Sequence, residues 1–352
     1  MSPDRRGRRF RGAVATLAAT FLVLFAWWST RSSTPLFRTA DGRVLPGSVA
    51  SLERIRLGGI DQWILVRGRD RANPILVFLH GGPGMPAMYL AHAFQGELEN
   101  SFTVVHWDRR GAGKSYSKDV PRSSLAVSQQ LADTLELVDV LRTRFGQRRV
   151  HLVAHSWGSL LGILAVSRRP DLFSSYVGVG QVVDDARARR IQVEFVEKEA
   201  RARNEEKVIE EIRRSPDSLE KYLFRYGGEL KKETSWWPLL AIGLRAPEYS
   251  FWDAVRVPRG VSFSHANTRD DVLGGRAPGE AIRRLEVPVW FFAGRSDYTS
   301  PSALVSEYVH RVEAPRKELV WFENSSHFPF LEEPARFAAE MRRVRAATKG
   351  PS

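Results

Sequence analysis

Ala154-His155-Ser156-Trp157-Gly158 is the stretch that decides the fold of this 352-residue chain. An apolar run at 150–154 leads into it, and a helical pattern at 160–167 leads out of it. The stretch matches the pattern G-x-S-x-G except that alanine stands at its first position. Such a sharp turn between a strand and a helix lifts the serine hydroxyl clear of the sheet edge. We therefore expect Ser156 to be a nucleophile.

The rest of the chain alternates apolar runs with helical patterns. Strands are predicted at 51–57, 62–66, 75–79, 103–107, 150–154, 176–179, 287–292 and 319–322. Helices are predicted at 125–145, 160–167, 302–312 and 334–346. Apolar strands separated by helices are typical of a mostly parallel sheet that is covered on both faces. The sequence therefore predicts an α/β fold with a mostly parallel central sheet and helices on both faces.

The alternation stops near Gln181 and resumes near 287, and the residues between them are mainly helical in pattern. This part includes Trp236, Trp237 and Trp252, which either line a substrate pocket or pack a cap onto the core. We expect four parts: 1–34, a basic tip with a membrane segment and linker; 35–181, the first part of the core; 182–276, a helical cap; and 277–352, the second part of the core.

The N-terminus resembles a membrane signal. Five arginines between positions 5 and 11 precede the uncharged residues 12–30, which as a helix would reach roughly 29 Å, about the thickness of a bilayer core. A cleaved signal peptide, with Thr30-Arg31-Ser32 as its cleavage site, and a buried helix are the alternatives. We expect an uncleaved, single-pass signal anchor with the catalytic domain on the extracytoplasmic side, or a secreted protein if the segment is cleaved.

The composition excludes several classes of site. The chain has no cysteine, so disulfides, thiolate ligands and a cysteine nucleophile are ruled out. The net charge is +13, but the basic residues are mixed with acidic ones, as at 185–203, so we expect no nucleic-acid partner. No H-E-x-x-H or comparable spacing is present, and we expect neither a metal nor another cofactor.

A serine nucleophile needs a histidine to take its proton and a carboxylate to orient that histidine. On sheets of this kind the acid and then the histidine follow the serine in the chain. Asp297 comes just after the strand at 287–292, and His327 comes just after the strand at 319–322. His310 lies inside a predicted helix, and Asp270 and Asp271 lie in the inserted segment. We therefore predict the triad Ser156, Asp297 and His327.

The oxyanion formed during attack needs hydrogen-bond donors. His80-Gly81-Gly82-Pro83-Gly84 directly follows the strand at 75–79, and its glycines let backbone amides turn toward a ligand. We expect the amides of Gly82 and Trp157 to be the donors. His80 itself is expected to hydrogen-bond within its turn rather than to act in catalysis.

Three motifs together resemble α/β-hydrolases of the proline iminopeptidase group: His80-Gly81-Gly82-Pro83-Gly84, the stretch from Trp107 to Ser115 (WDRRGAGKS), and His155-Ser156-Trp157-Gly158-Ser159. The resemblance covers the chain from about residue 40 to its end. It implies an α/β-hydrolase fold with about eight strands, a helical cap and an acyl-enzyme mechanism. The group usually has glycines where this chain has Ala154-His155. Its cap glutamates hold the substrate's amino group, and the candidates here are Glu194, Glu197 and Glu229.

The expected function is that of a serine hydrolase acting on an ester or amide, as an aminopeptidase similar to proline iminopeptidase. A carboxylesterase or lipase-like hydrolase of a small hydrophobic ester is one alternative. A ligand-binding protein without catalysis is another, because a fold alone does not determine function. The expected partners are a small-molecule or short-peptide substrate and, through residues 12–30, a membrane; the oligomeric state stays open.

Overall fold

The computed structural model describes residues 16, 20, 30–233 and 235–348. In these residues eight strands form one sheet in the order β1-β2-β4-β3-β5-β6-β7-β8. Only the β1–β2 and β2–β4 pairs are antiparallel. The strands are β1 (Val49–Leu57), β2 (Ile60–Gly68), β3 (Ile75–Leu79), β4 (Thr103–Asp108), β5 (Val150–His155), β6 (Phe173–Val179), β7 (Val289–Gly294) and β8 (Lys317–Phe322). The predicted fold class, a mostly parallel sheet of about eight strands, is confirmed.

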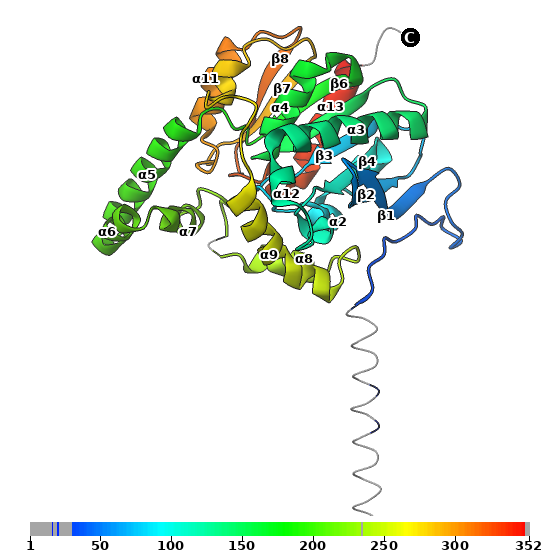
Figure 1. Ribbon diagram of the computed structural model, residues 1–352, viewed down its shortest axis with the longest axis horizontal. Helices are drawn as coiled ribbons and strands as arrows, with labels where there is room; N and C mark the ends of the chain where they lie inside the picture. Colours follow the sequence, from blue (N-terminus) through cyan, green and yellow to red (C-terminus); the bar gives the residue numbers. More distant parts are fainter. Residues whose placement is uncertain (1–15, 17–19, 21–29, 234, 349–352) are drawn as a thin grey trace, which may run out of the picture.

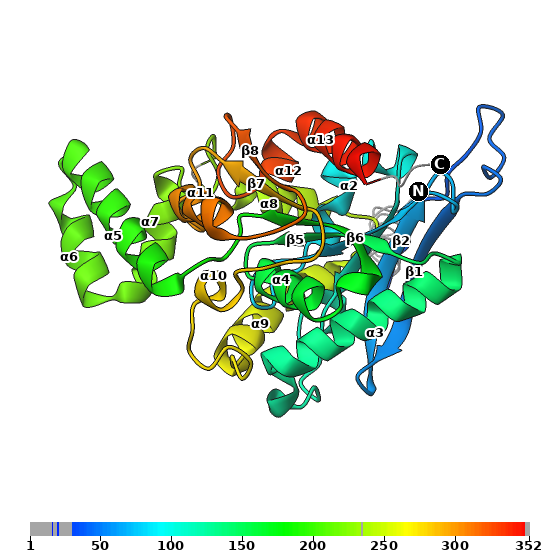
Figure 2. The same ribbon diagram turned by 90° about the horizontal axis from the view of Figure 1, so that it is seen from above.

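Helices cover both faces of the sheet (Figure 1, Figure 2). They are α2 (Ala91–Phe94), α3 (Val127–Phe145), α4 (Gly158–Arg168), α5 (Asp185–Ala202), α6 (Glu206–Arg214), α7 (Leu219–Arg225), α8 (Trp237–Leu244), α9 (Phe251–Asn267), α10 (Pro278–Ala281), α11 (Ser302–Arg311), α12 (Pro329–Glu332) and α13 (Pro334–Ala347). A short 3₁₀ turn, η1 (Met88–Leu90), precedes α2.

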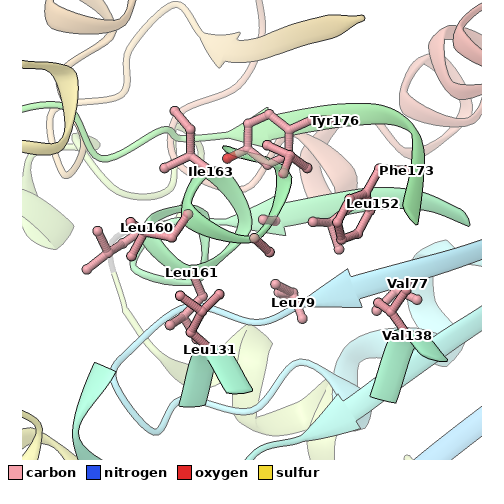
Figure 3. Packing of buried hydrophobic residues seen from close by; sticks show 14 of the residues in the cluster. Val77, Leu79, Leu131, Val138, Leu152, Leu160, Leu161, Ile163, Phe173 and Tyr176 are labelled. Atoms are coloured by element: carbon pink, nitrogen blue, oxygen red, sulfur yellow. The ribbon is translucent and has the colours of Figure 1, made fainter. Parts of the chain in front are cut away.

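Two hydrophobic clusters lie on the two sides of the sheet, because successive strand residues point to opposite faces. Val77 and Leu79 of β3 belong to the cluster that packs against α3, α4 and α11 (Figure 3). Leu76 and Phe78 of the same strand belong to the cluster that packs against α2, α12 and α13. Strands β3, β4, β5 and β7 are buried along their whole length, as central strands of a parallel sheet are.

The chain between β6 and β7 is helical. Helices α5, α6 and α7 extend to one side of the sheet and share a small core of their own, which includes Val196, Ile209 and Leu223 (Figure 1, Figure 2). We call these three helices the helical arm. Helices α8 and α9 instead lie against the core, where Leu239 of α8 is buried with residues of α2.

The predicted membrane anchor needs correction. Apart from Thr16, Thr20 and Thr30, residues 12–30 lie outside the described residues. Within the part of the chain that the structure describes, no helix is both long enough and apolar enough to cross a bilayer. Helices α3 and α5, which have 19 and 18 residues, carry charged side chains along their length. This finding contradicts the predicted localisation, a membrane-anchored or secreted protein with an extracytoplasmic catalytic domain, which is not retained.

Candidate active site

Ser156 occupies a strained turn between β5 and α4. Its backbone φ is 53°, in the left-handed region that non-glycine residues rarely adopt, and its amide donates a hydrogen bond to the carbonyl oxygen of Val179 at 2.9 Å. A Cβ built on Gly81 would lie 2.9 Å from the Ser156 Cβ, so the neighbouring loop approaches this closely only with glycine there. The predicted turn is therefore present, and it exposes Ser156 to a cavity.

Alanine is accommodated at position 154 because Gly162 of α4 lies opposite it. A Cβ added at Gly162 would come within 2.6 Å of the Ala154 Cβ and 2.8 Å of Tyr176 Cε2. Gly162 thus lets helix α4 come close to the strand, as a glycine two residues before the serine would also do. The departure of this chain from G-x-S-x-G leaves the geometry of the turn intact.

His327 and Asp297 form a buried pair at the carboxyl edge of the sheet. His327 Nδ1 lies 2.9 Å from Asp297 Oδ2, and both side chains are almost fully buried. The other oxygen of Asp297 accepts a hydrogen bond from the amide of Ser300 at 2.8 Å. Burial lowers the pKa of His327, but the charge of Asp297 and its hydrogen bond outweigh burial, and the pKa of His327 lies above its ordinary value.

Ser156 and His327 line the same cavity, which has a volume of about 340 Å³. The ring of His155, the residue before the serine, lies 4.6 Å from the ring of His327 and bonds to the His327 carbonyl oxygen at 2.9 Å. Because Nδ1 of His327 faces Asp297, Nε2 is the ring nitrogen left for the serine. The structure thus brings the three residues of the predicted triad to one edge of the sheet.

The expected oxyanion donors lie beside the serine. Gly82 and Trp157 line a hollow that also includes Ser156. The φ of Gly82 is 111°, and a Cβ there would meet the backbone nitrogens of Gly84 and Met85, so only glycine fits.

A buried arginine that the sequence reasoning did not single out supports this loop. Arg109 Nη2 donates to the carbonyl oxygen of Gly81 at 3.0 Å and lies 3.1 Å from His80 Nδ1, while its guanidinium sits 5.0 Å from the ring centre of Trp157. Burial lowers the pKa of Arg109 to about 9. His80 is held in its turn by this contact, in the structural role expected of it. The only signal for Arg109 in the sequence was that it lies inside the WDRRGAGKS stretch.

Of the three tryptophans predicted as substrate-binding, Trp236 lines the cavity. Trp237 and Trp252 are 71% and 49% exposed and are not among the described residues that line it. The aromatic residues of the cap therefore do not form one pocket.

Of the three candidate glutamates, Glu229 alone lines the cavity. Glu194 is exposed, and Glu197 is paired with Arg201 and Arg213 on the arm. The carboxyl of Glu229 is buried, and its Oε2 has no hydrogen-bond partner among the described residues. Burial raises the pKa of Glu229 to about 8, against the lowering influence of His327.

Other polar side chains of the cavity were not predicted. Arg189 and Gln192 of α5 and Glu220 of α7 line it beside Glu229. Their helical patterns resemble those of solvated surface helices, so the sequence offered no signal that they face a cavity.

Polar contacts join helix α9 and the segment before it to the end of β4. Asp108, at the end of β4, accepts hydrogen bonds from the hydroxyl of Tyr249 and from the amide of Lys114. The ammonium of Lys114 reaches Asp253 of α9 at 2.6 Å. Burial raises the pKa of Asp108 to about 7. These contacts fix the start of α9 on the core.

Comparisons with known proteins agree with this architecture. A model of the Alpha/beta hydrolase family matches residues 76–340. The probable aminopeptidase YbaC of Bacillus subtilis (strain 168) is 31% identical over 307 residues, which are 84% of this chain and 96% of that protein. A proline iminopeptidase of Clostridioides difficile (strain 630) is 27% identical over 272 residues, 74% of this chain and 86% of that protein.

The fold is also that of a solved proline iminopeptidase from Mycobacterium smegmatis. The two structures superpose with a TM-score of 0.62 at 20% identity, over 85% of this chain and 99% of that one. The predicted resemblance to the proline iminopeptidase group is confirmed, and the chain belongs to the alpha/beta hydrolase family, as a hydrolase with aminopeptidase-like relatives.

Proposed function

We propose that this chain is a serine aminopeptidase that removes an N-terminal residue from a short peptide or an amide. The observation that carries the proposal is that Ser156, His327 and the buried carboxyl of Glu229 line one cavity. Residues 182–276 form the cap in this proposal, and residues 35–181 and 277–352 form the core.

In the proposed reaction Ser156 Oγ bonds to the substrate carbonyl carbon while Nε2 of His327 takes the hydroxyl proton. The amides of Gly82 and Trp157 donate to the oxyanion. His327 passes its proton to the leaving amine as the C–N bond breaks, which leaves an acyl-enzyme. Water then attacks the acyl carbon, gives a proton to His327, and the serine leaves with that proton. Asp297 holds the imidazole and balances its positive charge.

In this proposal Glu229 makes the enzyme prefer substrates with a free amine. A carboxyl with a raised pKa in a buried position is neutral in part near neutral pH, and an incoming ammonium group favours its ionised form. The ion pair then replaces an unpartnered acid. The relatives named as an aminopeptidase and a proline iminopeptidase support this assignment.

Hydrolysis of an apolar ester is a second candidate, because Met85, Leu239 and Phe328 give the same cavity an apolar wall. The same serine chemistry acts on either bond. Binding without catalysis is disfavoured because the buried His327–Asp297 pair and the partly exposed Ser156 lie together at one cavity, as a nucleophile and its base require.

The test compares the purified full chain with Ser156→Ala and with Ser123→Ala, whose serine is exposed on the surface. Substrates are prolyl and alanyl p-nitroanilides, the same anilides with an acetylated amine, and p-nitrophenyl butyrate. We expect turnover of the free-amine anilides that acetylation and Ser156→Ala both abolish and that Ser123→Ala preserves. Turnover of the ester alone would replace the aminopeptidase with the esterase, and no turnover of any substrate would overturn both.

A further inference from the structure

A second hollow, which we call the chamber, lies next to the catalytic cavity. It has a volume of about 200 Å³ and lies between helices α8 and α9 and the segment from Met85 to Tyr89. Its wall includes Met85, Tyr89, Leu239, Leu240 and Val257, and none of the described residues that line it is charged. Figure 1 shows α8 and α9 next to each other at the lower edge of the molecule. The chamber therefore offers an apolar environment for a ligand.

The chamber and the catalytic cavity share one wall. Met85, Tyr89, Trp236 and Leu239 line both. Ser156, His327 and Glu229 line the first cavity but not the chamber. The two hollows therefore lie next to each other.

Helix α8 supplies one part of the chamber wall. Its sequence from Trp237 to Leu244 is WPLLAIGL, with no charged residue. A helix that is apolar on all sides is ordinarily buried on all sides. Here Leu239 is 4% exposed, whereas Leu240, the next residue and part of the chamber wall, is 45% exposed. The outer side of α8 thus leaves apolar surface for which the described chain provides no cover.

Gly243 keeps the chamber wall in place. A Cβ at this position would lie 2.8 Å from Cδ2 and 3.2 Å from Cε2 of Tyr89. Any larger residue would push α8 away from the ring of Tyr89, which lies on both the cavity and the chamber. The wall is consequently a close contact of α8 with the core and not a loose gap between them.

We propose that the chamber binds an apolar part of the substrate, an alkyl chain or an aromatic ring, that extends from the bond attacked by Ser156. The proposal deepens the proposed function and rests on it, since it assigns the substrate a polar, amine-bearing end near Glu229 and an apolar end between α8 and α9. Apart from Tyr89, Trp236 and Tyr249, which each carry one polar group, the side chains that line the chamber are apolar. The chamber therefore provides few hydrogen-bond partners for water, which favours an apolar occupant.

The kinetic test lengthens the apolar group on either side of the scissile bond. One series runs from p-nitrophenyl butyrate to p-nitrophenyl octanoate, and the other from alanine butyl ester to alanine octyl ester. Each methylene that enters the chamber is expected to raise kcat/KM about fourfold until the chamber is full. We expect a gain of at least about tenfold from four to eight carbons in one of the series.

Two valines of α9 provide the matched variants. Val257 lines the chamber, whereas Val255 is exposed and does not line it. Val257→Phe should remove the gain with chain length and leave the short substrates within about threefold of wild type, while Val255→Phe should keep the gain. Ala254→Leu fills the same chamber from a second position and guards against a folding defect of Val257→Phe. Equal chain-length dependence in wild type and both chamber variants, or none in wild type, would overturn the proposal.

A binding measurement separates this proposal from the proposed function. Calorimetric titration of Ser156→Ala with 1-octanol and with 1-butanol requires no turnover. We expect 1-octanol to bind at least about tenfold more tightly and Val257→Phe to remove that difference. If no substrate is hydrolysed but this difference is found, the hydrolase and the substrate's place in the chamber fail, and only the binding of an apolar ligand in the chamber stands. If peptides are hydrolysed but the difference is absent, the chamber fails and the hydrolase stands.

Discussion

The backbone carbonyl oxygen of Glu229 accepts a hydrogen bond from the amide of His327 at 2.8 Å. The cap segment that carries the buried carboxyl is therefore attached directly to the loop that carries the catalytic histidine. Since the contact is made by backbone atoms, the side chain of Glu229 can be replaced without breaking it. This makes the side chain's role in binding an amine open to a direct test.

Glu229→Gln should lower kcat/KM for prolyl or alanyl anilides by about 10- to 100-fold, because a hydrogen bond to a charged group contributes roughly 1.5–3 kcal/mol. Hydrolysis of p-nitrophenyl butyrate, which has no amine, should change less than about threefold. Steady-state kinetics on both substrates measure the difference. Glu194→Gln, at an exposed position outside the cavity, is the control. Equal losses on both substrates would contradict amine recognition by Glu229.

Ser156→Ala should lower kcat by about 10⁴-fold or more, because the remaining donors cannot replace a nucleophile. Labelling with a fluorophosphonate, followed by mass spectrometry, should modify Ser156 in the wild type. Asp297→Asn should also lower kcat strongly while leaving Ser156 in place. A Ser156→Ala variant that retains the wild-type rate would rule out the proposed nucleophile.

The pH dependence of the reaction should follow the pKa of His327. The imidazole must be neutral to take the serine proton, and the net influence of Asp297 raises its pKa above 6.5. Activity on p-nitrophenyl butyrate should therefore be lost as the pH falls through a value above 6.5. Asp297→Asn should move this acidic limb of the pH profile, where activity is lost, to lower pH and should also slow the reaction. The measurement is kcat/KM from about pH 5 to about pH 9, and a limb below 6.5 in the wild type would contradict the pairing.

The buried carboxyl of Glu229 should also affect stability. Its pKa is raised to about 8 from an ordinary value of 4.5, so its favourable contribution is complete below pH 4.5 and is lost as the pH rises through about 8. Relative to Glu229→Gln, the wild type should lose stability over this window, on the order of 1.4 kcal/mol for each unit of pKa shift. Urea denaturation of both proteins near pH 5 and near pH 8.5 measures this difference. A constant difference between the two would show that the carboxyl is solvated.

Gly162→Ala should destabilise the protein by about 1–3 kcal/mol, because the new methyl group would press on Ala154 and Tyr176. Ala154→Gly in the same chain removes one of these two contacts and should restore part of the loss. A double-mutant cycle in thermal or urea denaturation measures the coupling. Strictly additive effects would mean that the two residues do not share this space.

The sequence predicted the elements of the core better than those of the cap. The strand predicted at 75–79 is β3 with the same bounds, and the helix predicted at 125–145 is α3 with its first two residues removed. Strong apolar runs and helical periodicity are local signals, so a single sequence contains them. The segment around Trp252 lies in the part that was expected to be mainly helical but had no predicted helix bounds, and it forms α9, a 17-residue helix with Pro258 inside it. A proline in a helix usually indicates a break, and here contacts with the core outweigh that preference.

The expected triad residues were found from their order after strands, because the carboxyl ends of parallel strands meet at one edge. The burial of Glu229 could not be found in this way, since it depends on the cap folding over that edge. The exposure of Trp237 and Trp252 could not be predicted from the sequence either. Their aromatic side chains favour a pocket, but the face of the helix on which each lies decides its exposure, and packing between distant segments sets that face.

The helical arm has a small hydrophobic cluster of its own. At its base, Phe224 of α7 belongs to the sheet cluster that includes Leu76, and Ala188 and Ile191 of α5 pack against the other sheet cluster. The arm's main aromatic contact with the catalytic edge is Phe195, whose ring stacks at 3.7 Å on Tyr298, the residue after Asp297. Mutations within the arm's own cluster, such as at Ile209 of α6, therefore do not alter a residue of either sheet cluster. The arm contributes Arg189, Gln192 and Glu220 to the cavity wall, so substitutions at these three positions would reshape the cavity without replacing Ser156, Asp297 or His327.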